Sequence, residues 1–194
     1  MSKLSLCVYC GSRVGSKPAF EEAARRVGTL IGERGWQLVY GGGNAGLMGV
    51  VANAALAAGA TVVGVIPHSL MERELGHVGL SELHVVETMH QRKQLMAERS
   101  DAFLALPGGI GTFEELFEVW TWRQLGYHDK PVGLLNVGAY YDQLLSFLDV
   151  SVDDGFVAVP QRELLQVATD PAELLERLAA QARTATAPDD YRKI

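Results

Sequence analysis

The sequence predicts an α/β fold with a mostly parallel sheet of about seven strands, doubly wound with helices on both faces. Short apolar runs alternate with longer segments in which apolar residues recur every three or four positions, the pattern of strands followed by helices. Several of the runs end in glycine-rich turns. Because 48% of the 194 residues are hydrophobic, the chain can bury one sizeable core. We therefore expect a single domain over residues 1–183.

The predicted strands are short and apolar, as expected in a parallel sheet that is covered on both faces. They fall at residues 5–9, 37–40, 61–66, 83–86, 102–106, 131–135 and 164–167. The last of them is expected at an edge of the sheet.

The predicted helices lie between these strands, at about residues 17–34, 47–58, 89–99, 113–125, 140–152 and 170–183. Ser16, Thr88, Thr112 and Asp170 stand where a side chain can cap a helix start. Residues 69–81 are expected to form a loop or a short helix. Residues 184–194 are low in hydrophobic residues, and we expect a disordered tail there.

The charge and the cysteines limit the possible partners and cofactors. A net charge of −6 argues against general nucleic-acid binding, and no apolar run approaches the roughly 18 residues that span a membrane. We expect a cytoplasmic protein. Cys7 and Cys10 have the spacing C-x-x-C, but in a strand residues three apart point to opposite faces. The five histidines show no ligand spacing, so we expect no metal and no cofactor.

The stretch from Phe103 to Leu116 carries the strongest chemical signal. A buried strand ends at Pro107, and the following glycines allow a sharp turn and a close approach to a ligand. Such a turn directs backbone N–H groups and the positive end of a helix dipole at one spot, which suits a phosphate. The alternative interpretation is a glycine-rich turn followed by two solvated glutamates, Glu114 and Glu115, in the first turn of the helix.

A second glycine-rich turn follows the second predicted strand. Gly41, Gly43 and Gly46 fit the G-x-G-x-x-G pattern of dinucleotide-binding proteins. That pattern also requires an acidic residue at the end of the next strand, and here the strand ends in Pro67-His68. A mononucleotide is therefore favoured over NAD. The alternative is that small residues simply allow close packing of helix and strand.

The chain resembles a known family in several motifs. Residues 107–115 read PGGIGTFEE, and further matches are CGS at 10–12, GGGNAGLMG at 41–49, MHQRK at 89–93, TW at 121–122 and HDKPVGLLN at 128–136. They resemble the LOG ("lonely guy") family, the cytokinin riboside 5'-monophosphate phosphoribohydrolases, whose members were often labelled lysine decarboxylases. The resemblance covers nearly the whole chain. It implies a Rossmann-like fold, a homodimer, and hydrolysis of adenine-type nucleoside 5'-monophosphates to free base and ribose 5-phosphate.

The loops at 10–12, 41–46, 68–74 and 107–112 all leave the carboxyl ends of strands, so we expect them to line one crevice. A carboxylate can stabilise the oxocarbenium-like state in which a base–ribose bond breaks, and Glu115 is the candidate. Arg92 could orient this carboxylate or bind the nucleotide. The resemblance likewise assigns catalysis to Arg92 and Glu115, and it assigns substrate contact to Glu74, Lys93 and Thr121. The other expected substrate-binding residues are Gly42, Gly43, Met89, Gly109, Ile110, Gly111, Thr112, Phe113 and Glu114.

Two other functions fit parts of the sequence. A non-catalytic nucleotide-binding module would explain the loops but would leave Arg92 and Glu115 without a role. Lysine decarboxylation would need a lysine to form a Schiff base with pyridoxal phosphate, and Lys93 is the candidate. The apolar residues all round the helix at 113–125 favour a homodimer, since such a helix needs cover on both sides. The choice between AMP and N6-isopentenyl or zeatin-type nucleotides stays open.

Overall fold

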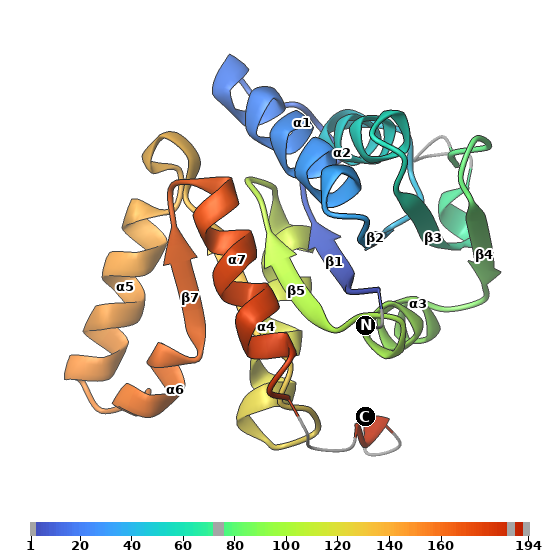
Figure 1. Ribbon diagram of the computed structural model, residues 1–194. Helices are drawn as coiled ribbons and strands as arrows, with labels where there is room; N and C mark the ends of the chain where they lie inside the picture. The colour runs from blue at the N-terminus through green and yellow to red at the C-terminus, as the bar shows by residue number, and fades with distance from the viewer. Residues whose placement is uncertain (1–2, 72–75, 186–188, 192–194) are drawn as a thin grey trace.

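The computed structural model describes residues 3–71, 76–185 and 189–191. Seven parallel strands form one sheet in the order β4-β3-β2-β1-β5-β6-β7 (Figure 1). Their bounds are Ser5–Tyr9 (β1), Gln37–Tyr40 (β2), Thr61–Pro67 (β3), Glu82–Val86 (β4), Ala102–Ala105 (β5), Val132–Leu135 (β6) and Leu165–Ala168 (β7). The predicted α/β class, parallel sheet and edge strand at the carboxyl end of the chain are confirmed.

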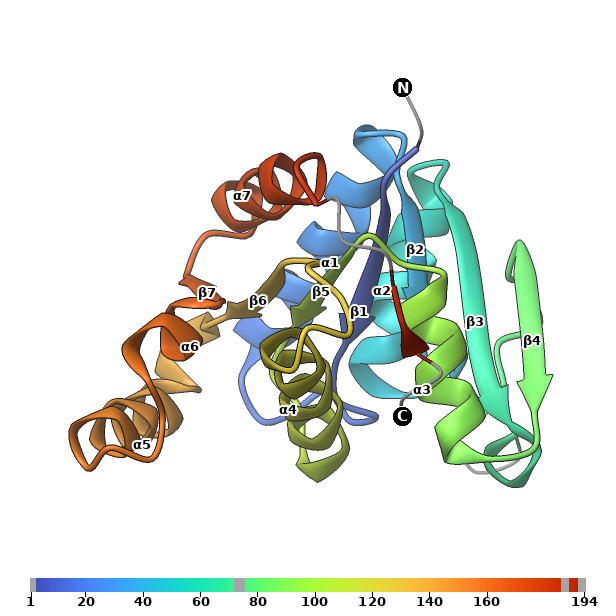
Figure 2. The same cartoon turned by 90° about the horizontal axis from the view of Figure 1, so that it is seen from below.

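Helices cover both faces of the sheet, which gives the expected doubly wound, Rossmann-like arrangement (Figure 2). The longer ones are Pro18–Glu33 (α1), Gly46–Ala57 (α2), Met89–Glu98 (α3), Ile110–Gln124 (α4), Asp142–Asp153 (α5) and Pro171–Ala182 (α7). Shorter ones are Val159–Glu163 (α6) and the 3-10 turns His68–Leu70 (η1) and Val137–Ala139 (η2). Residues of α1, α2 and α7 pack in the core on one face, and residues of α3, α4 and α5 pack in the core on the other.

The side chains of β1 alternate between these two cores. Leu6 and Val8 belong to the core beneath α1, and Cys7 and Tyr9 belong to the core beneath α4. Cys10 lies with the first group, so the two cysteines face opposite sides of the sheet, as the strand pattern predicts. Burial raises the pKa of the Cys7 thiol to about 12 and raises the pKa of Cys10 further, which keeps both thiols neutral.

Of the four predicted helix caps, those of Thr88 and Asp170 are confirmed, and those of Ser16 and Thr112 are wrong. Thr88 accepts a hydrogen bond from the Gln91 N–H and forms a capping box with that residue at the start of α3. Asp170 accepts from the Glu173 N–H at the start of α7. Ser16 is not the cap of α1, because the helix starts one residue later, after Lys17, and makes no side-chain cap. Pro18 with its fixed φ provides the helix start instead.

Helix α4 is covered on its outer side by parts of this same chain. The indole Nε1 of Trp120 donates to the Gln161 carbonyl of α6, 3.0 Å away, and the ring of Trp122 lies 5.9 Å from that of Tyr191. The five-residue helix α6 was not predicted from the sequence, although Pro160 stands in its first turn, where proline is compatible with a helix start. The apolar residues all round α4 are thus explained in large part without a second subunit.

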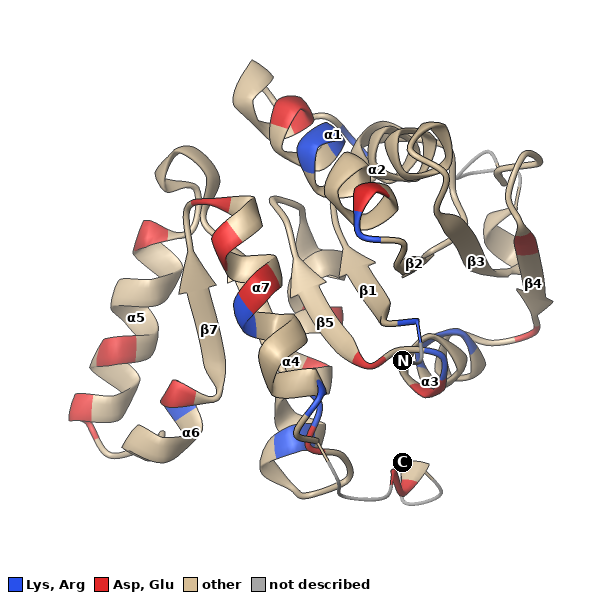
Figure 3. Ribbon diagram, in the orientation of Figure 1, with Lys and Arg blue, Asp and Glu red and all other residues tan. Residues whose placement is uncertain are grey.

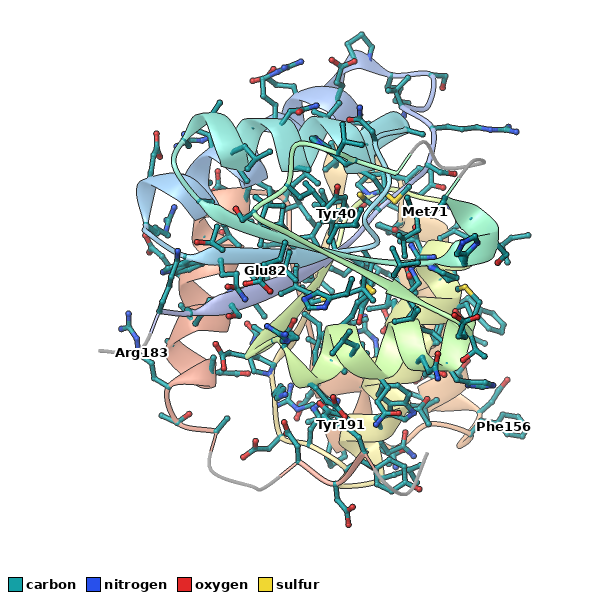
Figure 4. The ribbon with its side chains drawn as sticks, turned by 90° about the vertical axis from the view of Figure 1, so that its right-hand side faces the viewer. Tyr40, Met71, Glu82, Phe156, Arg183 and Tyr191 are labelled. Atoms are coloured by element: carbon teal, nitrogen blue, oxygen red, sulfur yellow. The ribbon has the colours of Figure 1, made fainter. Side chains whose placement is uncertain are left out.

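Residues 189–191 do not follow the expectation of a disordered tail. Tyr191 is buried beside α3 (Figure 4), and its hydroxyl accepts a hydrogen bond from Lys130 Nζ at 3.2 Å. The same ammonium group lies 2.6 Å from an Asp189 carboxylate oxygen and donates to the Ala97 carbonyl of α3. The predicted single domain over residues 1–183 stays a prediction, as does the state of the rest of the tail.

The imidazole of His128, 1% exposed, has both nitrogens engaged. Nε2 lies 3.0 Å from the Val119 carbonyl, to which it donates, and Nδ1 accepts from the Lys130 N–H at 3.1 Å. Burial, which disfavours the charged ring, lowers the pKa of His128 to about 4. Protonation would also remove the acceptor on Nδ1, so the folded protein holds a neutral His128.

This histidine makes the stability of the fold dependent on pH. Its folded pKa is below the unfolded value of about 6.5, so its contribution is present above that value and is lost as the pH falls toward 4. Between pH 7 and pH 5 the loss amounts to about 2 kcal/mol of unfolding free energy. Urea unfolding of the wild type and of a His128→Asn variant at both pH values measures it. Equal losses in the two proteins would contradict this assignment.

The charged side chains are spread over the surface. Acidic residues occupy α1, α5 and α7, with basic residues dispersed among them (Figure 3). Among the described residues, no helix is long and apolar enough to cross a membrane.

Candidate active site

The candidate site lies where the order of the strands reverses. Strands β1 and β5 are neighbours in the sheet, but the chain runs out to β4 before it returns to β5. The loops that leave their carboxyl ends diverge at this point, which is where open α/β sheets bind ligands. The Gly11 N–H donates to the Pro107 carbonyl at 3.1 Å, and the Leu47 N–H at the start of α2 donates to Gly11 O at 2.9 Å. Three segments that are distant in sequence are therefore held together beside the crevice.

A cavity of about 260 Å³ opens at this position. Its lining combines residues from each of the four loops that were expected to meet, which confirms that expectation. The lining residues are Val8, Tyr9, Cys10, Gly11, Ser12, Gly41, Met48, Leu70, Met89, Arg92, Gly109, Ile110, Gly111, Thr112, Glu114 and Glu115. Among the described residues, no group of three or more His, Cys, Asp or Glu is arranged to hold a metal ion.

The first turn of α4 forms one wall of the cavity, and it starts earlier than predicted. The helix begins at Ile110 with Gly109 as its extended N-cap, so the prediction of a helix that starts at Phe113 with Thr112 as its cap is wrong. The Phe113 N–H makes the first helical bond, to Gly109 O at 3.1 Å. The N–H groups of Ile110, Gly111 and Thr112 therefore stand at the helix terminus, where they can bind an anion.

Because α4 starts early, Glu115 lies in its second turn and not in the first. Its side chain is partly buried and lines the cavity. After burial, the negative charge of Glu115 is the largest contribution to the raised pKa of Cys10, and it also raises the pKa values of Cys7 and Tyr9. The carboxylate of Glu115 thus lies near the carboxyl end of β1, at the base of the crevice.

Arg92 reaches the same cavity from α3. Its residue surface is only 4% exposed, and Nη2 donates to the Gly41 carbonyl at 3.0 Å. Nη1 lies 3.9 Å from the sulfur of Met89, another lining residue. A buried guanidinium has to be compensated by acceptors or anions, so its place on the wall indicates a role in binding or chemistry.

The glycine turn after β2 supports this arginine. A Cβ atom on Gly41 would lie 2.1 Å from Arg92 Nη2, so only glycine leaves room for the guanidinium. Gly42 and Gly43, which we expected to contact the nucleotide, are not among the lining residues. Gly42 has φ +76° and packs against β3, and Gly43 pairs with Gly76 in an isolated bridge. At Gly46 a Cβ would meet the backbone of the β1–α1 loop at 2.3 Å, which favours close packing as the reason for that glycine.

Lys93 and Thr121 are not brought to the cavity. The Lys93 ammonium binds carboxylate oxygens of Glu114 at 2.5 Å and of Glu118 at 2.9 Å. Burial alone would lower the pKa of Lys93, but these two hydrogen bonds outweigh it and raise the pKa. Lys93 instead lines a second cavity of about 370 Å³ together with His90, Gln94, Glu118 and Trp122.

The remaining predicted site residues fall into a group that lines the cavity and a group that does not. Met89, Gly109, Ile110, Gly111, Thr112 and Glu114 line the cavity as expected. Phe113 does not, because its ring packs toward Tyr141, with 6.2 Å between the ring centroids. Thr121 is exposed on α4, and Glu74 lies outside the described residues.

Sequence reasoning placed Gly41 and Leu70 in loops that line the crevice without singling them out, and it missed Val8, Tyr9 and Met48 as lining residues. Gly41 directly follows β2, and Leu70 lies in the turn η1 that follows β3, so their position after parallel strands was the available signal. Met48 lies in the first turn of α2, where the sequence pattern predicts an ordinary core residue.

Comparisons with known proteins agree with this geometry. A family model described as "Possible lysine decarboxylase" matches residues 48–178. The cytokinin riboside 5'-monophosphate phosphoribohydrolase LOG1 of Arabidopsis thaliana is 51% identical over 173 residues, which are 89% of this chain and 81% of that protein. The probable cytokinin riboside 5'-monophosphate phosphoribohydrolase LOGL6 of Oryza sativa subsp. japonica is 51% identical over 90% of this chain and 70% of its own length.

Solved structures of more distant proteins share the fold. The molybdenum cofactor binding protein of the phototrophic bacterium Rippkaea orientalis has a TM-score of 0.71 at 23% identity, over 93% of this chain and 98% of that one. The Moco carrier protein of Chlamydomonas reinhardtii has the same score and identity, over 94% and 99%. With the family model and several enzymes about half identical to it over most of its length, this chain belongs to the LOG family of cytokinin riboside 5'-monophosphate phosphoribohydrolases.

Proposed function

We propose that this protein hydrolyses the N-glycosidic bond of adenine-type nucleoside 5'-monophosphates, either cytokinin riboside 5'-monophosphates or AMP, to the free base and ribose 5-phosphate. One observation carries the proposal. A buried arginine, a partly buried glutamate and an exposed helix N-terminus line a single cavity at the point where the strand order reverses. The names of relatives that are 51% identical to this chain support the same reaction.

The helix N-terminus would hold the 5'-phosphate. Three successive N–H groups, from Ile110 to Thr112, point along the helix axis at its positive end, which favours an anion. Apolar side chains on the remaining wall, those of Met48, Leu70 and Met89, offer a surface for the base. In this arrangement the ribose lies between them, beside Glu115.

Bond cleavage places positive charge on the ribose ring, and an anionic carboxylate stabilises that charge in a site shielded from water. Glu115 is the group proposed for this role. Its carboxylate would also bind a ribose hydroxyl or activate the attacking water. Arg92 would orient the carboxylate or stabilise the negative charge that develops on the departing base. Both side chains already lie in the cavity wall, so little rearrangement is needed to bring them to the substrate.

Lysine decarboxylation does not fit these residues. A Schiff-base lysine must lose its proton to react, whereas the contacts with Glu114 and Glu118 raise the pKa of Lys93. Lys93 also lines the second cavity and not the one that holds Arg92. The description of the family model as a possible decarboxylase thus has no support from Lys93.

The test is product analysis by chromatography after incubation with AMP, adenosine and isopentenyladenosine monophosphate, without added cofactor. Release of free base from the two monophosphates and not from adenosine is expected, and the ratio of the two rates ranks the substrates. A folded protein that binds AMP but releases no base would favour a non-catalytic nucleotide-binding module.

The phosphate site gives a separate prediction at Gly111. Nothing in the structure lies within 4 Å of a Cβ atom placed there, so the fold itself tolerates alanine. If a phosphate sits against these N–H groups, the added methyl group would meet it. We expect Gly111→Ala to raise KM for the monophosphate about tenfold, the equivalent of one lost hydrogen bond, with an unchanged melting temperature. An unchanged KM would place the phosphate elsewhere.

We further propose that the protein is a cytoplasmic homodimer. Large apolar side chains remain exposed on the protomer, among them Leu125 directly after α4, Phe147 of α5 and Phe156, which projects from the edge of the molecule (Figure 4). Such residues are common where subunits meet. Sedimentation equilibrium of the purified protein tests the dimer, and a single species of 21.0 kDa across the concentration range would contradict it.

A further inference from the structure

The turn that precedes α4 has each of its backbone carbonyls held from outside the turn. The hydroxyl of Tyr141 donates to Leu106 O at 2.7 Å, the Gly11 N–H donates to Pro107 O at 3.1 Å, and the hydroxyl of Tyr140 donates to Gly108 O at 2.5 Å. Three consecutive carbonyls are thus tied by three different donors. Two of the donors are adjacent tyrosines that follow β6.

The segment between β6 and α5 is built to deliver these two hydroxyls. The side-chain oxygen of Asn136 accepts from the Tyr141 N–H at 2.8 Å, and its amide donates to Asp142 at 2.7 Å. Gly138 and Ala139 both adopt left-handed backbone, with φ of 55° and 61°. Ala139 is the one non-glycine residue with positive φ among the described parts of the chain. A left-handed alanine is strained, so the surrounding contacts impose this path on the chain.

The two tyrosines act on the turn without touching the candidate active-site cavity. Neither is among the residues that line it. Tyr141 is buried, and burial raises the pKa of its hydroxyl, which therefore keeps its proton and stays a donor. Tyr140 is 39% exposed, and its ring packs edge-on against Phe20 and Tyr141. Removal of its hydroxyl alone would leave these ring contacts in place.

The direction in which the carbonyls of this turn point affects the binding of an anion at the start of α4. In the turn that joins β5 to α4, each peptide can present either its N–H or its C=O toward the cavity, and a carbonyl oxygen there would repel a phosphate. Hydrogen bonds from tyrosine hydroxyls hold the carbonyls of Leu106 and Gly108 toward the β6–α5 segment. The turn is also tightly packed, because a Cβ on Gly108 would lie 2.1 Å from Thr112 Oγ1 and 2.9 Å from Gly11 N.

We propose that Tyr140 and Tyr141 are positioning residues for phosphate binding, which fix the turn 106–108 so that the N–H groups at the start of α4 face the 5'-phosphate. This inference rests on the proposed function, since it assigns the pair to the phosphate half of that site. The chemical group recognised is a phosphate monoester. The base half of the site does not depend on the pair.

The test compares two ligands that each occupy half of the site. Binding of D-ribose 5-phosphate and of adenine is measured by titration calorimetry for the wild type, for Tyr140→Phe and for Tyr127→Phe, which removes a phenol hydroxyl outside the site. Loss of one neutral hydrogen bond predicts a Kd for ribose 5-phosphate five- to tenfold higher in Tyr140→Phe. The Kd for adenine and the melting temperature of Tyr140→Phe should match those of the wild type. The control variant Tyr127→Phe should match the wild type in both Kd values and in melting temperature.

Tyr141→Phe provides a second variant, with the same selective loss expected if it folds. Equal weakening of both ligands in Tyr140→Phe would show a general structural effect and overturn the proposal. Wild-type affinity for ribose 5-phosphate in Tyr140→Phe would overturn it as well, as would a wild type that binds no ribose 5-phosphate. Because binding is measured without turnover, a wild type that binds ribose 5-phosphate but hydrolyses no nucleotide would refute the proposed function alone.

Discussion

Replacement of Glu115 by glutamine is expected to lower kcat about 100-fold, with KM for the nucleoside monophosphate nearly unchanged. Glutamine has the shape of glutamate but no charge, so the side chain still fills its place in the cavity wall. What disappears is the anion that opposes the positive charge of the ribose in the transition state. A charge that matters mainly in the transition state affects kcat far more than substrate binding.

Steady-state kinetics with AMP or isopentenyladenosine monophosphate measure the effect, and thermal unfolding checks that the variant is folded. Glu98→Gln on α3 is a suitable control, because this glutamate is exposed and accepts a hydrogen bond from Gln94 on the same helix. Turnover within twofold of the wild type in Glu115→Gln would remove this carboxylate from the mechanism.

Much of the architecture could be predicted because the strands are buried on both faces. Such strands read as unbroken apolar runs, and their bounds follow from the glycine and proline residues beside them. The parallel direction of the strands, and with it the meeting of the loops at one crevice, follows from the alternation of strands and helices, whereas the order of the strands was not predicted. The candidate site could therefore be placed at the carboxyl ends of the strands before any side chain was seen, but its position between β1 and β5 required the observed strand order.

The start of α4 could not be predicted from the sequence by the usual signals. Gly-Ile-Gly-Thr at residues 109–112 has two glycines and two β-branched residues, which is a poor helix sequence, and Thr112 looks like a cap. In the structure the cap position belongs to Gly109, which makes no side-chain hydrogen bond. Tertiary contacts at the preceding turn, including those of Gly11 and Tyr140, hold the first helical turn in place of a local cap.

The sequence also could not select between adjacent residues of the same kind. Arg92 and Lys93 are both basic residues near the start of α3, but neighbouring residues on a helix point about 100° apart, so one faces the cavity and the other faces α4. The same limit applies to the three glycines at 41–43. Which of them lies beside the cavity depends on the path of the turn after β2, and that path is set by packing against β3.

Alanine at Gly41 is expected to lower kcat/KM 30- to 100-fold by displacing Arg92, without unfolding the protein. The new Cβ would lie 2.1 Å from Nη2 and 3.2 Å from Cζ of Arg92, so the guanidinium has to move away from the Gly41 carbonyl. The displaced atoms are the far end of a flexible side chain, so the cost to stability is small. The cost to activity is close to that of Arg92→Ala, about 100-fold, if the position of the guanidinium is what matters.

A double-mutant cycle isolates this contact. In an Arg92→Ala background there is no guanidinium for the new methyl group to displace, so Gly41→Ala should then have almost no further effect. The four proteins are compared by kcat/KM with one nucleoside monophosphate and by thermal unfolding. If Gly41→Ala costs as much activity in the Arg92→Ala protein as in the wild type, the glycine acts on the ligand by itself, and its role as the space for Arg92 is refuted.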